Sequence, residues 1–535
     1  MQKSKNISFK YDLSPESVCG NLKTRFFGSK DDSPKAILIT TIVCAFLCYF
    51  YHMVNGLGCP DTLTEGIYTY KSYDYTTSLA RWMIRYLNEL FGKNIVVPAL
   101  IVLFYCLMIG ISVYIICRMT GLTEPFYQIM LTAMMVSFPV ILHQFAYMCA
   151  ALAYSFSFLS VVIGTLLIRT RKIPGIVFGI LFYLMMLGSY QSYIGAISSL
   201  AVILLIHDAL YEKKISAGLI RFALCGACGL FACLIDMPFS SWMMKIHGIE
   251  QSSRVAEFSY KSIFENFGFS FKYSYVWFFS YFNNEVLSRN RFYFVIFAVI
   301  AVLSVLTIIR LFKDKAILNA IIVSASILVL PAAMNLILFV FTGYGMHDIL
   351  RYQYVLIFLL LFILHKYLGK NILNSLSKYL SVLAVLFLLI GNIISANCTA
   401  YMYKIYYDHY KQQYMLAMNR IYELEGYTEN ITKIVTGGTP SCEVFHIANP
   451  KIFRYAEQEG GPVFWADPFG MTASREYFFQ DFLGVNPGTL TNQEYHDIIH
   501  SEEYAQMPVW PAEGSVKMIG GMAVIKFTDY PPSYY

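Results

Sequence analysis

Apolar residues along the chain gather into eleven long runs separated by shorter polar segments. A helix needs about 20 consecutive, mainly apolar residues to cross a bilayer. The pattern therefore predicts an α-helical polytopic membrane protein with about eleven transmembrane helices, at residues 36–54, 95–117, 126–142, 148–168, 173–188, 193–210, 215–235, 292–312, 316–341, 353–366 and 379–400.

The regions outside these runs predict how the chain is organised into domains. We expect a segment 1–35, a transmembrane domain 36–400 with long loops at 55–94 and 236–291, and a C-terminal domain 401–535. The C-terminal region has one helical pattern, "YYDHYKQQYMLAMNRIYELEGY", and strand-like runs in "KIVTGG", "SCEVFHIA" and "KMIGGMAVIKF". These patterns predict a small α/β domain. We interpret it as a structural or acceptor-binding lid, because no glycine loop or catalytic elbow is visible in it.

Composition and charge agree with a membrane protein and add an orientation. Hydrophobic residues make up 57% of the chain and charged residues 14%, against about 25% charged residues in soluble domains. Lysine and arginine favour loops on the cytoplasmic side. They are frequent in the first 35 residues and recur in every second loop, at Arg118, 169–172, 212–214, 310–315 and 365–371. This alternation predicts a cytoplasmic N-terminus and an external C-terminus.

The first outer loop ends in an amphipathic pattern, "TSLARWMIRYLNELFG" at residues 77–92. Apolar residues recur there at steps of three and four, which predicts one helix lying along the outer membrane surface. Arg81 and Arg85 lie a turn apart on its polar face. They are suited to hold a lipid phosphate, although a plain interfacial helix would show the same pattern.

Three carboxylates precede this helix, at Asp61, Glu65 and Asp74. Asp61 follows the first apolar run closely, and a carboxylate near the bilayer costs desolvation energy unless it is hydrated, paired or used. Aspartate beside proline is also a common turn residue. A functional role and a turn role therefore both stay open for Asp61.

A second polar group lies at the outer end of the predicted tenth helix, where "HDILRYQYV" places His347, Asp348 and Arg351 within two helical turns. Arg351 is suited either to a local pair with Asp348, with its stem along the helix, or to a lipid phosphate.

Two short outer turns, "HQFAYM" at 143–148 and "SYQS" at 189–192, contain His143, Tyr190 and Gln191. Such groups at membrane depth often line a cavity, while capping and turn roles suit each of them singly. The aromatic segment 258–282 predicts a further helix on the outer leaflet.

Three of these features resemble a known family. They are "PDTLTEG" followed by "SLARW" in the first outer loop, "LGSYQSYIGA" at 187–196, and an outer tail after the last span. With the number of spans, they look like the Gtr type II glucosyltransferase family, a group of GT-C-type membrane glycosyltransferases. The resemblance covers most of residues 36–440. Where that family usually has a glycine before the arginine, this chain has Ala80, and the acidic pair is not adjacent, so the partner of Asp61 stays open between Glu65 and Asp74.

The resemblance implies an inverting hexosyltransferase in the bacterial cytoplasmic membrane. It would move glucose, the sugar expected from the family, from a polyprenyl-phosphate carrier to a cell-surface glycan such as O-antigen, on the outer side. The expected partners are the lipid-linked donor, the glycan acceptor and the bilayer; a separate carrier synthase and flippase stay open, and no nucleic acid is expected. No cofactor is expected either, although some GT-C enzymes use a divalent metal; the sequence has no visible metal-ligand cluster.

Such a reaction needs a carboxylate base for the acceptor hydroxyl and cations for the leaving phosphate. Asp61 is the first candidate for the base, with Glu65 and Asp74 as alternatives, and Arg351 and Arg81 are the first candidates for the cations. The other candidate substrate-binding residues are Arg85, His143, Tyr190, Gln191, His347 and Asp348.

Two other functional classes fit part of the pattern. A transporter or flippase of a lipid-linked glycan would explain the spans, but it fits the large first outer loop poorly, and the chain has no visible inverted repeat. In a non-enzymatic envelope-assembly protein, Asp61 would be replaceable. An outward-opening groove lined by both Asp61 and Arg351 would favour the transferase.

Overall fold

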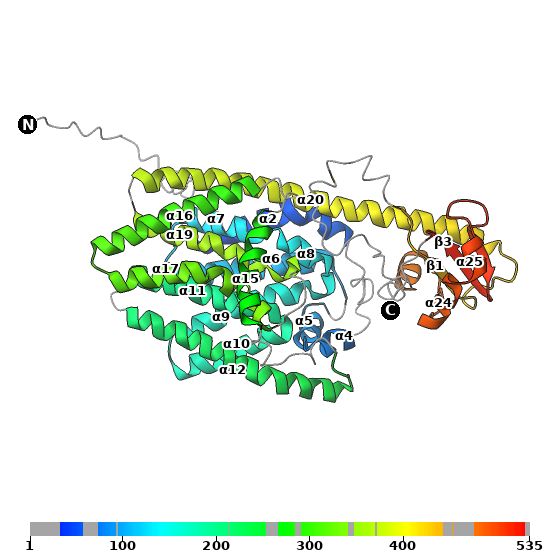
Figure 1. Cartoon of the computed structure of the whole chain (residues 1–535), viewed down its shortest axis with the longest axis horizontal. Coiled ribbons are helices and arrows are strands. Elements are labelled where there is room, and N and C mark those ends of the chain that lie inside the picture. Colours follow the sequence, from blue (N-terminus) through cyan, green and yellow to red (C-terminus); the bar gives the residue numbers. More distant parts are fainter. Residues whose placement is uncertain are drawn as a thin grey trace, which may run out of the picture.

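The computed structural model describes residues 33–56, 73–92, 95–212, 215–252, 266–283, 290–340, 347–369, 372–441, 452 and 476–529. Most helices run side by side along the long axis of the molecule, and a small sheet lies beyond one end of this bundle (Figure 1). Asp61 and Glu65 lie outside the described residues.

The first half of the described chain contains α2 (Ser33–Asn55), α4 (Asp74–Ser78), α5 (Met83–Gly92), α6 (Pro98–Thr120), α7 (Pro125–Val136), α8 (Val140–Ala146), η1 (Met148–Ala150), α9 (Ala151–Arg169), α10 (Ile173–Ser189), η2 (Gln191–Tyr193), α11 (Ile194–Tyr211) and α12 (Ile215–His247). The second half contains α15 (Phe267–Phe282), α16 (Asn290–Lys313), α17 (Ile317–Met334), α18 (Ile337–Val340), η3 (Asp348–Leu350), η4 (Tyr352–Leu356), α19 (Ile357–Leu368), α20 (Ile372–Tyr422), β1 (Ile434–Gly437), η5 (Phe479–Leu483), α24 (Asn492–Ile499), α25 (Glu502–Gln506), β2 (Val516–Ile519) and β3 (Met522–Lys526).

Each predicted apolar run coincides with helical structure. In the described part of the chain, nine helical segments are long and apolar enough to cross a membrane, and Ile173–Ser189 and Tyr352–Leu368 are apolar but shorter. Aliphatic side chains on the rim point away from the bundle, for example Leu328, which is 68% exposed. Apolar surface of this kind marks contact with a membrane. A polytopic helical membrane protein is thus confirmed, while the number of crossings stays a prediction.

Helix α19 forms the centre of the bundle. Its residues 357–364 are at most 2% exposed, and it packs against α16, α11 and α7. A helix that is apolar all round is stable only when buried. This burial fixes the short helical turns η3 and η4 that precede α19 and contain Asp348 and Tyr352.

Basic loops predicted to share one side of the membrane meet at one end of the bundle. Asp208 is 1% exposed and accepts hydrogen bonds from Arg169, at 2.7 and 3.0 Å, and from Arg221, at 3.3 Å. At the end of α16, Arg310 donates to the carbonyl of Tyr367 in α19 at 2.8 Å. These contacts agree with the predicted alternation of loops; which side faces the cytoplasm stays a prediction.

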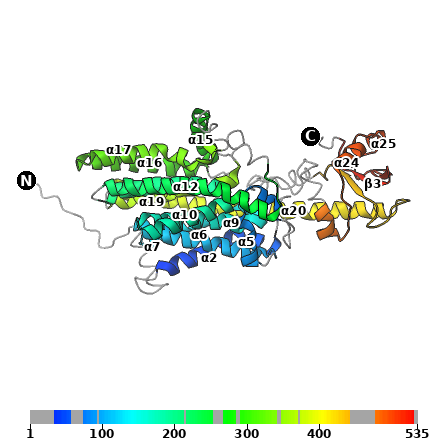
Figure 2. The ribbon, with the colours of Figure 1, turned by 90° about the horizontal axis from the view of Figure 1, so that it is seen from below.

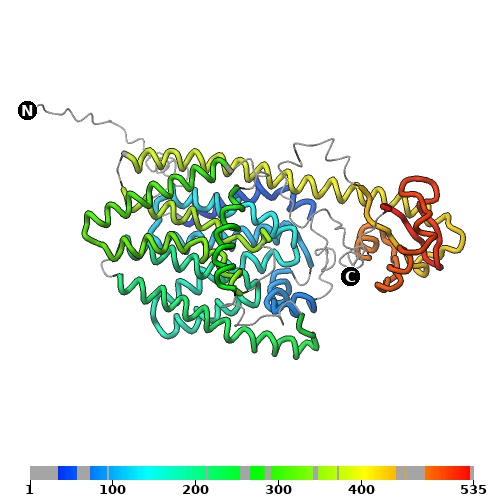
Figure 3. Tube along the Cα trace, in the orientation of Figure 1, coloured from blue at the N-terminus to red at the C-terminus, as the bar shows by residue number. Residues whose placement is uncertain are grey.

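Two helices extend beyond their predicted ends. Helix α12 continues past residue 235 to His247, so the region 236–291 begins with a helix and not with a loop. Helix α20 runs without a break through residue 401 and extends past the bundle to the sheet (Figure 3). The tyrosines at 403, 407, 410 and 414 explain this continuity, because they recur at helical spacing and are at most 4% exposed.

The C-terminal sheet has the order β1–β3–β2, with β3 parallel to β1 and antiparallel to β2. The predicted single strand "KMIGGMAVIKF" is instead a hairpin, because Gly520 and Gly521 adopt φ values of 56° and 80° and turn the chain. The strand predicted in "SCEVFHIA" falls at residues outside the described ones. Arg420 of α20 donates to the carbonyls of Pro511 and Ala512, each at 2.9 Å, which ties the sheet to the helix.

The aromatic segment forms α15, which runs across the direction of the bundle helices and packs on α17 and α18 (Figures 1 and 2). Ser270 donates to the Leu338 carbonyl at 2.9 Å, and Asn335 donates to the Ser274 carbonyl at 2.9 Å. The crosswise direction agrees with the predicted helix on a membrane surface.

The ionic cluster around Asp208 allows a test of the fold. Replacing Asp208 by asparagine leaves Arg169 without its buried anion, while Arg221 keeps its pair with Glu212. Breaking a buried pair costs about 3–5 kcal/mol. We expect a clear drop in the thermal unfolding midpoint in detergent. Asp314→Asn is the control, since its pair with Arg310 is exposed and such pairs contribute about 0–1 kcal/mol. Equal unfolding midpoints for both variants would show that the cluster around Asp208 does not hold these helix ends together.

Candidate functional site

The two stretches "SLARW" and "LGSYQSYIGA" pack directly against each other. The Nε2 of Gln191 donates to the backbone carbonyls of Leu79, at 3.0 Å, and Ala80, at 3.2 Å. The indole of Trp82 lies against Gly188, where an added Cβ would overlap the ring. A glycine is therefore required at 188 for this approach, and the two stretches form one structural unit.

Ala80 adopts a left-handed conformation, with φ of 61°. This conformation costs non-glycine residues roughly 1–2 kcal/mol, so a glycine at this position would be less strained than Ala80. It also corrects the prediction of one helix over 77–92. The helix breaks after α4 (Asp74–Ser78), and α5 begins at Met83. Spacing alone could not reveal this break, because it depends on the contacts of Gln191.

Arg81 lies in this break and not on the predicted helical face. Its guanidinium carbon is 4.6 Å from the centre of the Tyr190 ring, and Tyr190 in turn stacks edge-on with Tyr154 at 4.6 Å. Among the described residues, the buried Nε of Arg81 has no hydrogen-bond partner. An unsatisfied buried donor on a cation is costly, so an anion bound here would relieve that cost.

Helix α5 is held by contacts from both of its faces. Asn88 donates to the Cys149 carbonyl at 3.0 Å, and Arg85 lies 3.0 Å from His247 at the end of α12. The buried positions are Ile84, Leu87 and Asn88. Leu90, assigned to the apolar face by spacing, is 76% exposed.

Of the three carboxylates predicted in the first outer loop, the structure describes only one. Asp74 is exposed at the first position of α4, while Asp61 and Glu65 lie outside the described residues. The predicted groove lined by both Asp61 and Arg351 therefore stays a prediction.

The second polar group surrounds Arg351, which is 6% exposed. Arg351 forms an ion pair with Asp348, and its guanidinium carbon lies 5.2 Å from the Trp277 ring centre and 5.6 Å from that of Tyr281. His143 Nε2 is 3.7 Å from the other oxygen of Asp348. The local Asp348–Arg351 pair is thus present, and two rings of α15 cover the arginine. His347 is exposed beside this group.

Gln144 connects the two groups. It is fully buried and lies in α8, with His143, and not in the predicted turn. Its Nε2 donates to the Tyr193 hydroxyl and to the Ile349 carbonyl, each at 3.1 Å, and its carbonyl accepts from Tyr105. Tyr193 also lies 6.3 Å from Tyr190, ring centre to ring centre. Hydrogen bonds and ring contacts together therefore run from the stretch around Arg81 to the one around Arg351.

Sequence analysis missed one buried carboxylate next to this site. Asp236 in α12 is 8% exposed and accepts hydrogen bonds from the Trp82 indole, at 3.4 Å, and from Ser240, at 3.3 Å. The signal was its position directly after the apolar run 215–235. Through Trp82, Asp236 helps to fix the chain next to Arg81.

The described residues contain no group of three or more histidine, cysteine, aspartate and glutamate side chains arranged to hold a metal ion. In the described part of the chain, the candidate site combines two arginines with aromatic rings, amides and the carboxylates of Asp348 and Asp236. Such groups suit the binding of an anion bearing a polar, ring-shaped group.

The fold and this site define a polytopic membrane protein with a cationic and aromatic site at the end of the bundle that faces the sheet. The sequence model of the glucosyl transferase GtrII family matches residues 64–364. Since this is more than half of the chain, the protein belongs to that family. The match includes Arg81, the stretch around Gln191 and Arg351. Neither the curated proteins nor the solved structures gave a match.

The contact between the two stretches generates a prediction. Gly188→Ala should overlap Trp82 and lower stability by about 1–3 kcal/mol, the usual effect of overpacking. Ala80→Gly should leave stability unchanged or raise it, because glycine adopts positive φ without steric cost. Thermal unfolding in detergent measures both. If Ala80→Gly destabilises the protein as much as Gly188→Ala does, the left-handed turn is not the constraint described here.

Proposed function

We propose that this protein transfers a hexose, glucose by family expectation, from a polyprenyl-phosphate carrier to a cell-surface glycan. The transfer takes place on the outer side of the bacterial cytoplasmic membrane, at the end of the bundle nearest the C-terminal sheet. Membership of the glucosyl transferase GtrII family carries this proposal. It favours a transferase over a transporter or flippase of a lipid-linked glycan, and over a non-enzymatic assembly protein.

The proposed reaction is a single displacement with inversion. The acceptor hydroxyl oxygen attacks the anomeric carbon, the bond from that carbon to the phosphate oxygen breaks, and the hydroxyl proton passes to a carboxylate. We assign the carboxylate role to Asp61, with Glu65 and Asp74 as weaker candidates. The exposed position of Asp74 on α4 supports this order, because a base gains from a partly desolvated site.

Arg81 is the better of the two candidate cations for the leaving phosphate. Arg351 is already neutralised by Asp348 and covered by Trp277 and Tyr281. Arg81, by contrast, makes no ion pair with a carboxylate among the described residues, and its guanidinium lies over the Tyr190 ring. A guanidinium can hold phosphate oxygens in a bidentate way. We therefore assign donor binding to Arg81, with Arg85 beside it, and an orienting role to the group of His143, His347, Asp348 and Arg351.

Tyr190 and Gln191 have supporting roles in this proposal. Tyr190 provides the ring under the Arg81 guanidinium, and Gln191 holds the turn on which Arg81 lies. The separate carrier synthase and flippase would supply the donor on the outer side, which agrees with the orientation predicted from the basic loops.

If Asp61 is the base, replacing it should lower the rate of sugar transfer. Asp61→Asn should keep the protein folded but lower the transfer rate by roughly 100-fold or more, the scale of losing a general base. Glu65→Gln and Asp74→Asn are the matched variants and should do less. The measurement is transfer of labelled hexose in nanodiscs. A wild-type rate for Asp61→Asn would make Asp61 a turn residue only.

If Arg81 binds the donor phosphate, substitutions of Arg81 and Arg351 should change the donor KM by different amounts. Arg81→Lys should raise the donor KM about tenfold, because it loses a charge-assisted hydrogen bond of about 1.5–3 kcal/mol. Arg351→Lys should have a smaller effect on the donor KM, since Asp348 already neutralises that cation. Arg310→Lys is the control, because Arg310 also lies over a tyrosine ring, at 4.7 Å, but at the opposite end of the bundle. If the donor KM is unchanged in Arg81→Lys but raised in Arg351→Lys, Arg351 binds the donor phosphate and Arg81 has the orienting role.

A further inference from the structure

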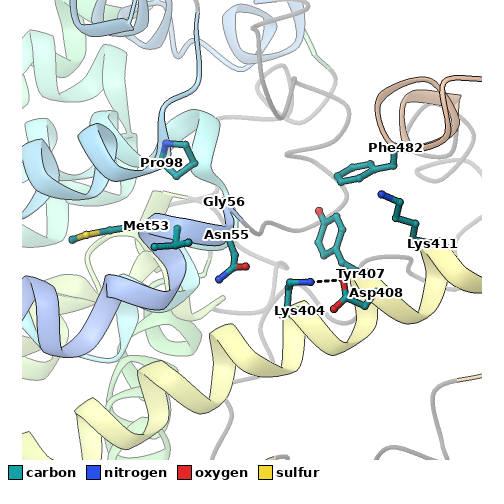
Figure 4. Close-up of a pocket in the computed structure, with 10 residues that line it drawn as sticks. Met53, Asn55, Gly56, Pro98, Lys404, Tyr407, Asp408, Lys411 and Phe482 are labelled. Carbon is teal, nitrogen blue, oxygen red and sulfur yellow. Dashed lines mark hydrogen bonds and ion pairs between the residues drawn. The ribbon is translucent and has the colours of Figure 1, made fainter.

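A pocket of about 380 Å³ lies apart from the groups around Arg81 and Arg351. Residues 53–56 at the end of α2 and Pro98 at the start of α6 line one side of it. One face of α20 lines the other side, and Phe482 of η5 lies near its outer end (Figure 4). The pocket thus lies where the helix bundle and the C-terminal region face each other.

The depth of the pocket matches the outer membrane surface. Lys404 comes four residues after the apolar run 379–400, which is about 6 Å along a helix. The head-group layer outside the hydrocarbon core is about 5–7 Å thick on each side. Lys411 lies two further turns along α20, about 10 Å farther out. The pocket therefore extends from the head-group layer into water.

The wall on α20 combines charges with an aromatic ring. Lys404, Tyr407, Asp408 and Lys411 recur at steps of three and four, so they share one helix face. Lys404 and Asp408 form an ion pair, whereas Lys411 makes no ion pair with a residue in the described part of the chain. The rings of Tyr407 and Phe482 lie 5.5 Å apart, centre to centre. In Figure 4 the Tyr407 hydroxyl points into the space between the two sides.

These groups match the chemistry of a saccharide better than that of a lipid tail. A sugar ring has an apolar C–H face that packs on aromatic rings, and hydroxyls that bond to ammonium, carboxylate and amide groups. Lys411 provides an ammonium group, Asp408 a carboxylate and Asn55 an amide. The volume lies in the range of small-ligand pockets, about 300–1,000 Å³.

We propose that this pocket is the acceptor subsite, and that it binds a sugar unit of the glycan that receives the hexose. The proposal rests on the proposed function. The position of the pocket supports it, because Gly56 in its wall precedes Asp61, the proposed base, by five residues in the chain. The C-terminal region then contributes to acceptor binding through Phe482, which gives a chemical role to the region interpreted from sequence as a lid.

The test separates the acceptor from the donor. The full-length protein in nanodiscs receives polyprenyl-phosphate-linked, labelled glucose, with or without surface glycan extracted from cells in which this gene is disrupted. Two rates are measured: transfer to the glycan, and hydrolysis of the donor to free glucose without glycan. Lys411→Gln and Phe482→Ala should raise the glycan KM about tenfold and leave donor hydrolysis unchanged. Gln412→Ala is the control, since Gln412 is exposed on α20 but does not line the pocket.

Three results would overturn the proposal. Wild-type glycan KM values for both pocket variants would show that the acceptor binds elsewhere. Equal losses of hydrolysis and transfer would place the donor in the pocket. A change only in how the rate depends on added phosphatidylglycerol would identify a site for anionic lipid. If the wild-type protein neither hydrolyses the donor nor transfers glucose to the glycan, the proposed function is wrong. The proposal of an acceptor subsite is then wrong as well.

Discussion

The hydrogen bonds from the Gln191 amide to the carbonyls of Leu79 and Ala80 hold together the site at the end of the bundle that faces the C-terminal sheet. They fix the left-handed turn at Ala80, which ends α4 and lets α5 begin in a new direction. The same turn places Arg81 over Tyr190 and Trp82 against Gly188. A single side-chain amide, two residues after the end of α10, thus connects the segment of α4 and α5 to the bundle.

The rest of the bundle makes this end rigid. The buried helix α19 fixes the turns that precede it, and Gln144 joins those turns to Tyr193, close to Tyr190. Buried polar networks specify one arrangement when their members are satisfied. The turn held by Gln191 positions Arg81, and the contacts with Asp348 and α15 position Arg351. Helix α20 continues without a break beyond the bundle and carries the C-terminal sheet (Figure 3).

Sequence pattern predicted what depends on local periodicity, and it missed what depends on tertiary contacts. The apolar runs and the helical class could be predicted, because burial in lipid imposes long and uniform patterns. The family could be predicted from the short motifs in the first long loop and at 187–196. The break at Ala80 could not, since its cause is Gln191, more than 100 residues away. Asp236 was missed because only its bond to Trp82 shows its importance. By contrast, the hairpin at Gly520 and Gly521 had a local signal, adjacent glycines between strand-like residues, and was open to prediction.

The central claim is that this member of the glucosyl transferase GtrII family takes its sugar from a lipid-linked donor at the outer end of the bundle. The most direct measurement compares two labelled donors with the purified protein in nanodiscs: polyprenyl-phosphate-linked glucose and a nucleotide-linked glucose. Labelled glucose on the extracted surface glycan is the readout. The account predicts incorporation from the lipid-linked donor and none from the nucleotide-linked donor. Incorporation from the nucleotide-linked glucose alone would contradict it.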